Sequence, residues 1–263
     1  MGNLASRVLV VVLLAPPVLA AMYVGGWLLV LLALVAAALG LDEFYRMTRT
    51  HRPIVIAGQA GAAVIVIGAH WGGLPWALWP LPLLLFFTFL LAAMVSMRES
   101  ATVSVAVTAL GVVWVGLGVA SLVMLRDVPE IGGDLLFAVV LGTWASDIFA
   151  YFGGRAFGRH RLAPAISPKK TVEGFVIGLV CGSLTVWWVL YDKVDRLDAA
   201  IIGVAVAFAA PWGDLFESFV KRDLGVKDSG TLLGGHGGVL DRIDALLFAA
   251  PAALVALDIT GRI

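Results

Sequence analysis

The sequence predicts an all-α, polytopic integral membrane protein with about nine transmembrane helices. Of its 263 residues, 61% are hydrophobic and only 14% are charged. The mean hydropathy of +0.99 lies far above the range of soluble domains. Apolar runs of about 20 residues, the length that spans a hydrocarbon core as a helix, recur along the whole chain.

The nine expected helices follow these apolar runs in order. Their approximate bounds are residues 7–24, 27–45, 54–71, 78–96, 101–125, 133–152, 173–191, 199–220 and 241–258. Runs such as WLLVLLALVAAALGL and LPLLLFFTFLLAAMV do not alternate between apolar and polar residues. Helices are therefore favoured over the strands of a β-barrel.

The distribution of Lys and Arg predicts the orientation of these helices. If the N-terminus is cytoplasmic, 14 of the 18 Lys and Arg residues fall on the inner side. The four on the outer side are Arg126, Lys193, Arg196 and Arg262. Because cytoplasmic loops carry an excess of basic residues, both long polar loops are expected to face the cytoplasm.

Global charge excludes one class of partner. The formal net charge is zero, so overall electrostatics do not indicate nucleic-acid binding. The single cysteine, Cys181, cannot form an internal disulfide, and its apolar surroundings favour a packing role.

Charged residues divide the chain into two halves. In residues 1–130 they sit almost wholly at the ends of expected helices, so this half is interpreted as a transmembrane scaffold. Asp42 and Glu43 are included in that interpretation, as acids solvated at a helix end. Residues 131–263 carry acids within or beside apolar runs and are expected to form the catalytic half.

The sixth expected helix contains one such acid, Asp147. An unpaired carboxylate costs at least about 2.5 to 3.5 kcal/mol at the bilayer centre, so Asp147 should face protein or water. Gly153 and Gly154 are expected to end this helix and to open a basic loop.

That loop ends in SPKKTVEG, with a turn expected at Ser167 and Pro168. It places Lys169 and Lys170 before a helix that begins at the capping residue Thr171. Two interpretations remain open: an anion site beside a helix N-terminus, or the ordinary basic excess of a cytoplasmic loop.

The eighth helix ends in a polar stripe. Pro211 and Gly213 can kink it, and four polar residues follow at positions i, i+3, i+4 and i+7 of one face: Asp214, Glu217, Ser218 and Lys221. Two carboxylates near a membrane boundary need partners, and metal or phosphate is the simplest choice.

The segment after this helix continues the polar pattern. It holds Lys227, Asp228, Ser229 and the glycine-rich stretch around His236, and then Asp241 and Asp244 in DRID. We expect Asp147, Asp214 and Asp241 to converge around one divalent cation. Carboxylates that lie together in a low dielectric repel one another unless such a cation lies among them. Nearby lysines and arginines suit Mg²⁺ with a nucleoside triphosphate. Neither GxxxxGK[ST] nor GxGxxG is present.

The stretch SFVKRDLGVKDSGTLLGGHGGVLDRID, residues 218–244, resembles the signature of the phosphatidate cytidylyltransferase (CDP-diacylglycerol synthase) family. SDIFAYFGGRAFGRH and SPKKTVEG resemble the preceding conserved region, so the likeness covers most of residues 147–244. One departure is Gly234, where proline is often expected. The first half of the chain matches only as a hydrophobic array.

The resemblance implies an enzyme of the cell membrane that is a homodimer and whose active site faces the cytoplasm. It implies the transfer of CMP from CTP to phosphatidate, by attack of the lipid phosphate on the α-phosphorus with Mg²⁺. It also suggests a second cation, of monovalent type such as K⁺. The products would be CDP-diacylglycerol and pyrophosphate.

The resemblance assigns roles to matching residues. The acids expected at the metal are Asp214 and Asp241, followed by Asp244 and Asp147. The residues expected to act directly in catalysis are Asp214, Asp241, Asp244 and Lys221. The residues expected to bind substrate are Lys221, Arg222 and Lys227 at the CTP phosphates, with Ser167, Lys169, Lys170 and Ser218 in the same polar cavity. His236 is interpreted as a loop-ordering or phosphate-contacting residue rather than a base.

Two other functions are weighed against this one. Another CTP-dependent membrane lipid enzyme, such as a polyprenol kinase or an archaeal-type CDP-lipid synthase, is disfavoured by the complete spacing of KDSG, GHGG and DRID. An ion-coupled transporter would place its acids near the membrane midplane and would not need lysine-rich cytoplasmic loops.

Overall fold

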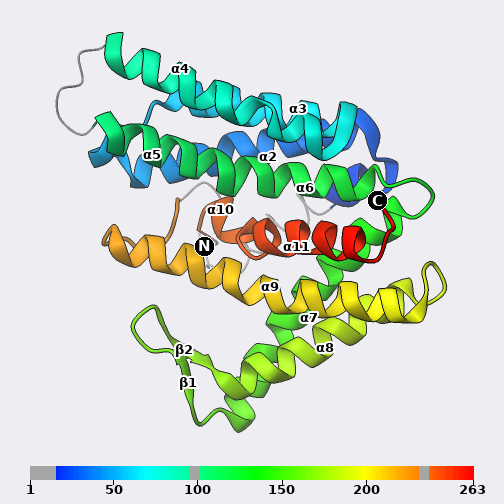
Figure 1. Cartoon of the computed structure of the whole chain (residues 1–263). Coiled ribbons are helices and arrows are strands. Elements are labelled where there is room, and N and C mark those ends of the chain that lie inside the picture. Colours follow the sequence, from blue (N-terminus) through cyan, green and yellow to red (C-terminus); the bar gives the residue numbers. More distant parts are fainter. Residues whose placement is uncertain (1–15, 95–100, 231–236) are drawn as a thin grey trace. The chain divides into compact units, whose positions relative to one another are not determined.

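The computed structural model of the chain describes residues 16–94, 101–230 and 237–263, which are mostly helical (Figure 1). Residues 16–24 are helical and precede α2. The elements that follow are α2 (Gly26–Met47), η1 (Arg49–His51), α3 (Val55–Leu78), α4 (Pro80–Met94), α5 (Ala101–Gly111), the π-helix η2 (Val112–Gly116), α6 (Leu117–Arg126), α7 (Gly132–Phe157), β1 (Arg161–Ala163), β2 (Ser167–Thr171), α8 (Val172–Leu190), α9 (Arg196–Asp223), α10 (Leu240–Ile243) and α11 (Leu246–Ile259).

The class predicted from the sequence is confirmed. Six helical stretches of the described chain are long and apolar enough to cross a membrane: α2, α3, the continuous stretch Ala101–Arg126, α7, α8 and α9. Large apolar side chains such as Trp144, Phe149 and Phe152 on α7 stay exposed, as expected of a surface in contact with lipid. The chain is an integral membrane protein.

The count of nine helices is not confirmed. The apolar helix α4 has 15 residues and α11 has 14, both shorter than a full span. Of the first expected span, 7–24, only residues 16–24 are among those described.

The described residues fall into two compact units that interleave along the chain. Unit 1 consists of Met1–Met124 with Asp228–Arg242, and unit 2 of Leu125–Lys227 with Ile243–Ile263. The segment Asp228–Arg242, which sequence analysis assigns to the catalytic half, therefore packs within unit 1. The functional division into residues 1–130 and 131–263 stays a prediction.

In unit 1, close packing holds the end of α2. The Tyr45 hydroxyl donates a hydrogen bond of 2.9 Å to the carbonyl oxygen of Thr108, and the Phe44 ring lies edge-on to Trp114. Gly111 leaves room for these rings, because a Cβ there would lie 2.8 Å from the Tyr45 ring. The last turns of α2 are thus fixed against α5 and η2.

In unit 2, a glycine ridge brings α7 and α8 together. Gly174, Gly178 and Gly182 recur every four residues on α8. Cβ atoms there would lie 2.6 Å from the Ala150 carbonyl, 2.6 Å from the Ser146 carbonyl and 3.0 Å from the Gly142 carbonyl, respectively. This antiparallel contact is the small-residue packing typical of membrane helices.

One glycine also sets the approach of α9 to the start of α11. A Cβ on Gly213 would lie 2.9 Å from the Cα of Ala245 and would overlap the Asp244 carbonyl oxygen. Only glycine permits this approach, which brings the backbone next to Asp214 against Asp244.

The segment between α7 and α8 differs from the sequence prediction in two respects. Gly153 and Gly154 do not end α7, which continues to Phe157, because Gly153 packs against Ile177 of α8 and Gly154 against its capping residue Thr171. Ser167 and Pro168 do not form the turn. They lie in β2, which pairs antiparallel with β1 through Ala163 and Ser167. The expected cap of α8 is confirmed, since Thr171 Oγ1 accepts a hydrogen bond of 3.2 Å from Gly174 N.

Candidate active site

The polar stripe of α9 forms the centre of a charged group in unit 2. Ser218 Oγ donates to Asp214 Oδ1 at 3.3 Å, and Lys221 Nζ lies 2.7 Å from Glu217 Oε2. Each pair is four residues apart, which confirms that the four side chains share one face. Glu217 is almost fully buried, with 1% of its side chain exposed.

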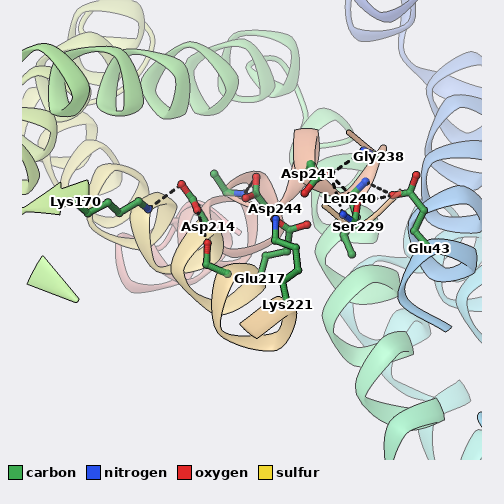
Figure 2. A network of polar contacts seen from close by, with 12 residues as sticks. Glu43, Lys170, Asp214, Glu217, Lys221, Ser229, Gly238, Leu240, Asp241 and Asp244 are labelled. Atoms are coloured by element: carbon green, nitrogen blue, oxygen red, sulfur yellow. Dashed lines mark hydrogen bonds and ion pairs between the residues drawn. The ribbon is translucent and has the colours of Figure 1, made fainter. Parts of the chain in front are cut away.

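The β-hairpin contributes a cation to this stripe. Lys170 Nζ lies 2.8 Å from Asp214 Oδ2, and the two side chains are 25% and 35% exposed (Figure 2). Lys169, its neighbour on β2, is exposed. Because successive residues of a strand point to opposite sides, the hairpin brings Lys170 to the stripe and directs Lys169 away from it.

Two further acids, Asp147 and Asp244, lie with this stripe. We define the acidic cluster as the acids Asp147, Asp214, Glu217 and Asp244 together with Lys170 and Lys221. The charges of Asp214 and Lys170 act on Asp147, which is exposed on α7. Asp244 Oδ1 accepts a hydrogen bond of 2.8 Å from Ala245 N, and its carboxylate interacts electrostatically with Asp214 and Asp147. The structure thus brings Asp147, Asp214 and Asp244 into one neighbourhood, and their role at a metal stays a prediction.

Electrostatic repulsion in this cluster is substantial. Asp244 lies before α11, outside the six long helices. Burial raises the pKa of Asp244 to about 7, and the negative charge of Asp214 adds to the rise. Carboxylates held together at low dielectric favour a nearby cation.

The acidic cluster fits Mg²⁺ bound partly by its substrate. Within residues 16–94, 101–230 and 237–263, no three His, Cys, Asp or Glu side chains form a metal site by themselves. Mg²⁺ usually takes one or two carboxylates and completes its shell with water and phosphate oxygens. Asp214 and Asp244 match that donor set, and a divalent ion would relieve the repulsion between them.

A second polar group lies in unit 1, and we call it the Glu43 network. Glu43 Oε1 accepts from Val239 N at 2.9 Å, and Glu43 Oε2 accepts from Leu240 N at 2.9 Å. Ser229 Oγ lies 2.9 Å from Glu43 Oε2 and 3.0 Å from Asp241 Oδ2. Asp241 Oδ2 also accepts from Ser229 N at 3.1 Å and Gly238 N at 2.7 Å (Figure 2).

Glycines make this network sterically possible. A Cβ on Gly238 would overlap Glu43 Oε2 and Ser229 Oγ, and one on Gly230 would lie 2.7 Å from Glu43 Oε1. Gly237 adopts φ +78°, which L side chains rarely occupy, with its Cα next to Asp241. The glycines of this segment thus serve close contact with carboxylates.

The prediction that acids at the end of this helix are solvated is confirmed for Asp42 and wrong for Glu43. Asp42 is partly exposed and pairs with Arg46 at 2.8 Å, as expected for a solvated helix end. Glu43 is buried, with a relative exposure of 6%. One signal could have found it: Glu43 follows Gly40 by three residues, on the helix face that carries the buried small residues Ala33 and Ala37.

The remaining predicted site residues lie apart from the acidic cluster or outside the residues that the structure describes. Arg222 and Lys227 are exposed after the polar stripe of α9, and Ser167 lies on β2. His236 lies outside the described residues. Asp241 belongs to unit 1 and Asp244 to unit 2, so the convergence of Asp241 with Asp147 and Asp214 stays a prediction.

The fold, the acidic cluster and the Glu43 network define a class: a polytopic membrane protein with a site in which acids and lysines lie together. Residues 5–260 match the cytidylyltransferase family, and the chain belongs to that family.

Three similar proteins share one name. The chain is 44% identical to the phosphatidate cytidylyltransferase of Aquifex aeolicus over 130 residues, 49% of each chain. It is 43% identical to that of Mycobacterium bovis over 134 residues, 50% of this chain and 44% of the relative. These alignments cover about half of each relative. The phosphatidate cytidylyltransferase of Staphylococcus aureus is 32% identical over 241 residues, 89% of this chain and 91% of the relative.

Proposed function

We propose that the chain is a phosphatidate cytidylyltransferase, which transfers CMP from CTP to phosphatidate and releases CDP-diacylglycerol and pyrophosphate. The observation that carries this proposal is the acidic cluster, in which Asp214 and Asp244 lie together with Lys170 in a member of the cytidylyltransferase family. The shared name of the relatives supports these substrates.

The proposed reaction exchanges one phosphoanhydride for another. An oxygen of the phosphatidate phosphate attacks the α-phosphorus of CTP, and the bond from that phosphorus to the bridging oxygen breaks. The electron pair leaves with pyrophosphate. Because the lipid phosphate is already largely ionised at neutral pH, the step needs no strong general base.

The task left to the protein is to align two anions that repel each other. Lys170 and Lys221 lie at carboxylates in the acidic cluster, where each ammonium would be within reach of a bound phosphate. Arg222 and Lys227 would add charge at the CTP phosphates. Ser167, Ser218 and His236 would complete the substrate contacts, whereas Lys169 points away from the stripe and is not part of this proposal.

Asp214 and Asp244 would hold Mg²⁺, with Asp147 and Asp241 as the further acids that the family resemblance suggests. Bound Mg²⁺ would neutralise phosphate charge and fix the orientation of the triphosphate. A second, monovalent cation such as K⁺ belongs to the same proposal.

We also propose a homodimer in the cell membrane with its active site towards the cytoplasm. The excess of Lys and Arg on one side of the predicted topology supports this orientation. The phosphate of phosphatidate lies at headgroup level, so a site near the membrane boundary suits it.

The test is an assay of the purified protein in mixed micelles with Mg²⁺, phosphatidate and labelled CTP. We expect pyrophosphate release that requires both substrates and a labelled lipid product, with both signals lost when EDTA removes Mg²⁺. Turnover that persists in EDTA would contradict the role of the metal.

Two further arms separate the alternatives. Replacing phosphatidate by a polyprenol should give no product, whereas a polyprenol kinase would phosphorylate it. Ion uptake into proteoliposomes, measured without CTP, should be absent. If the phosphatidate assay gives no product, and either polyprenol phosphorylation or ion uptake is observed, the proposed function is wrong.

A further inference from the structure

We propose that Glu43 is a positioning residue, which anchors the two flanks of the glycine-rich segment, residues 229–230 and 237–241, and thereby sets the activity of the enzyme towards CTP. This inference rests on the proposed function for its effect on activity. The anchoring itself rests on the contacts of Glu43 alone.

Glu43 holds the chain on both sides of residues 231–236. On one side its Oε2 lies 2.9 Å from Ser229 Oγ, and on the other both carboxylate oxygens accept from Val239 N and Leu240 N. Asp241 bridges the same two sides through Ser229 N and Gly238 N. One acid from α2 and one from the segment itself therefore define where the two flanks lie.

The groups that face the Glu43 carboxylate in these contacts are all hydrogen-bond donors. Two are backbone amides and one is the Ser229 hydroxyl. A glutamine has one acceptor oxygen and one NH₂ group, so either orientation of its amide turns N–H towards at least one of these donors. The site is therefore specific for a carboxylate.

Glu43 is also rigidly placed. Its neighbour Tyr45 bonds to the carbonyl of Thr108, and its neighbour Phe44 packs on Trp114. The carboxylate is buried, so solvent competes little for its hydrogen bonds. A rigid anchor transmits its geometry to the segment that it holds.

The segment matters for the proposed reaction because it contains Asp241 and begins two residues after Lys227. The family resemblance assigns Asp241 to the metal and Lys227 to the CTP phosphates. An altered position of this segment should therefore change the handling of CTP more than that of the lipid.

The experiment compares Glu43→Gln with Asp42→Asn, a matched change at the adjacent residue, which pairs with Arg46 instead. We expect Glu43→Gln to lower kcat/KM for CTP by about 10- to 100-fold, as for other residues that orient a catalytic group. The KM for phosphatidate should stay unchanged. Asp42→Asn should behave as the unsubstituted protein.

Amide hydrogen exchange supplies a readout that does not depend on turnover. In Glu43→Gln the amides of Val239 and Leu240 should exchange faster, with the amides of α7 and α8 unchanged. If Glu43→Gln does not fold, Ser229→Ala takes its place, with an expected loss of about 2- to 10-fold in kcat/KM for CTP, the value of one hydrogen bond.

Two results would overturn the inference. One is an active unsubstituted protein whose Glu43→Gln variant keeps its kcat/KM for CTP. The other is unchanged exchange at Val239 and Leu240. An inactive unsubstituted protein with the expected change in exchange would instead contradict the proposed function and leave the anchoring supported.

Discussion

The acidic cluster of unit 2 and the Glu43 network of unit 1 both gather carboxylates, but they balance the negative charge in different ways. In the acidic cluster, side-chain ammonium groups lie 2.8 Å from Asp214 and 2.7 Å from Glu217. In the Glu43 network, Glu43 and Asp241 accept hydrogen bonds from backbone amides and contact the Ser229 hydroxyl.

The difference indicates two roles, ligand binding and structural anchoring. An ammonium on a flexible stem can turn to a phosphate, and a carboxylate that it leaves can accept a metal ion. Backbone amides cannot be exchanged in this way without refolding the segment. The acidic cluster is thus suited to ligands that bind and dissociate, and the contacts of Glu43 to fixed structure.

The largest expected effect is at Asp214. Asp214→Asn keeps the size of the side chain and removes its charge, so activity should fall by about a thousandfold or more while the protein stays folded. Asp241→Asn changes the other acid first proposed for the metal and should lower activity as far. The measurement is pyrophosphate release per folded protein, with folding monitored by thermal unfolding in detergent.

The matched control for Asp214→Asn is Asp195, the N-cap residue that precedes the same helix. Asp195→Asn removes an exposed acid that pairs with Arg262, which keeps its second partner Asp198. Its activity should equal that of the unsubstituted protein. Near-normal turnover of Asp214→Asn would remove this residue from the chemistry and would end the distinction between the two clusters.

An intermediate effect is expected at Gly238. In Gly238→Ala the new methyl group would displace Glu43 or Ser229, so activity should fall by about tenfold or more, as for loss of an orienting residue. Gly133→Ala is the control, because its Cβ would meet only Arg126 at 3.8 Å. Equal activities in the two variants would argue that the Glu43 network has no influence on turnover.

The smallest effect is expected at the cap of α8, outside both clusters. Thr171→Ala removes the hydrogen bond to Gly174 N, so the free energy of unfolding should fall by about 1 kcal/mol. Thr171→Ser keeps the oxygen and should retain most of the stability. Thermal unfolding compares the two, and a loss in both variants would assign the effect to the methyl group instead.

Local patterns predicted much of the molecule. Apolar runs identified most of the helices, and the i, i+4 spacing of Asp214, Glu217, Ser218 and Lys221 predicted contacts that the structure contains. The same local reasoning was wrong for the end of α7, because Gly153 and Gly154 are used for contact with α8 rather than for a helix stop.

What the sequence by itself determined is therefore the membrane class, the polar face of α9 and the cap of α8, since each depends on residues within a few positions of one another. The tertiary structure alone decided that Lys170 pairs with Asp214 and that Glu43 is buried. Glu43 and Ser229 are 186 residues apart, and no local pattern encodes a contact that forms only when distant segments pack together.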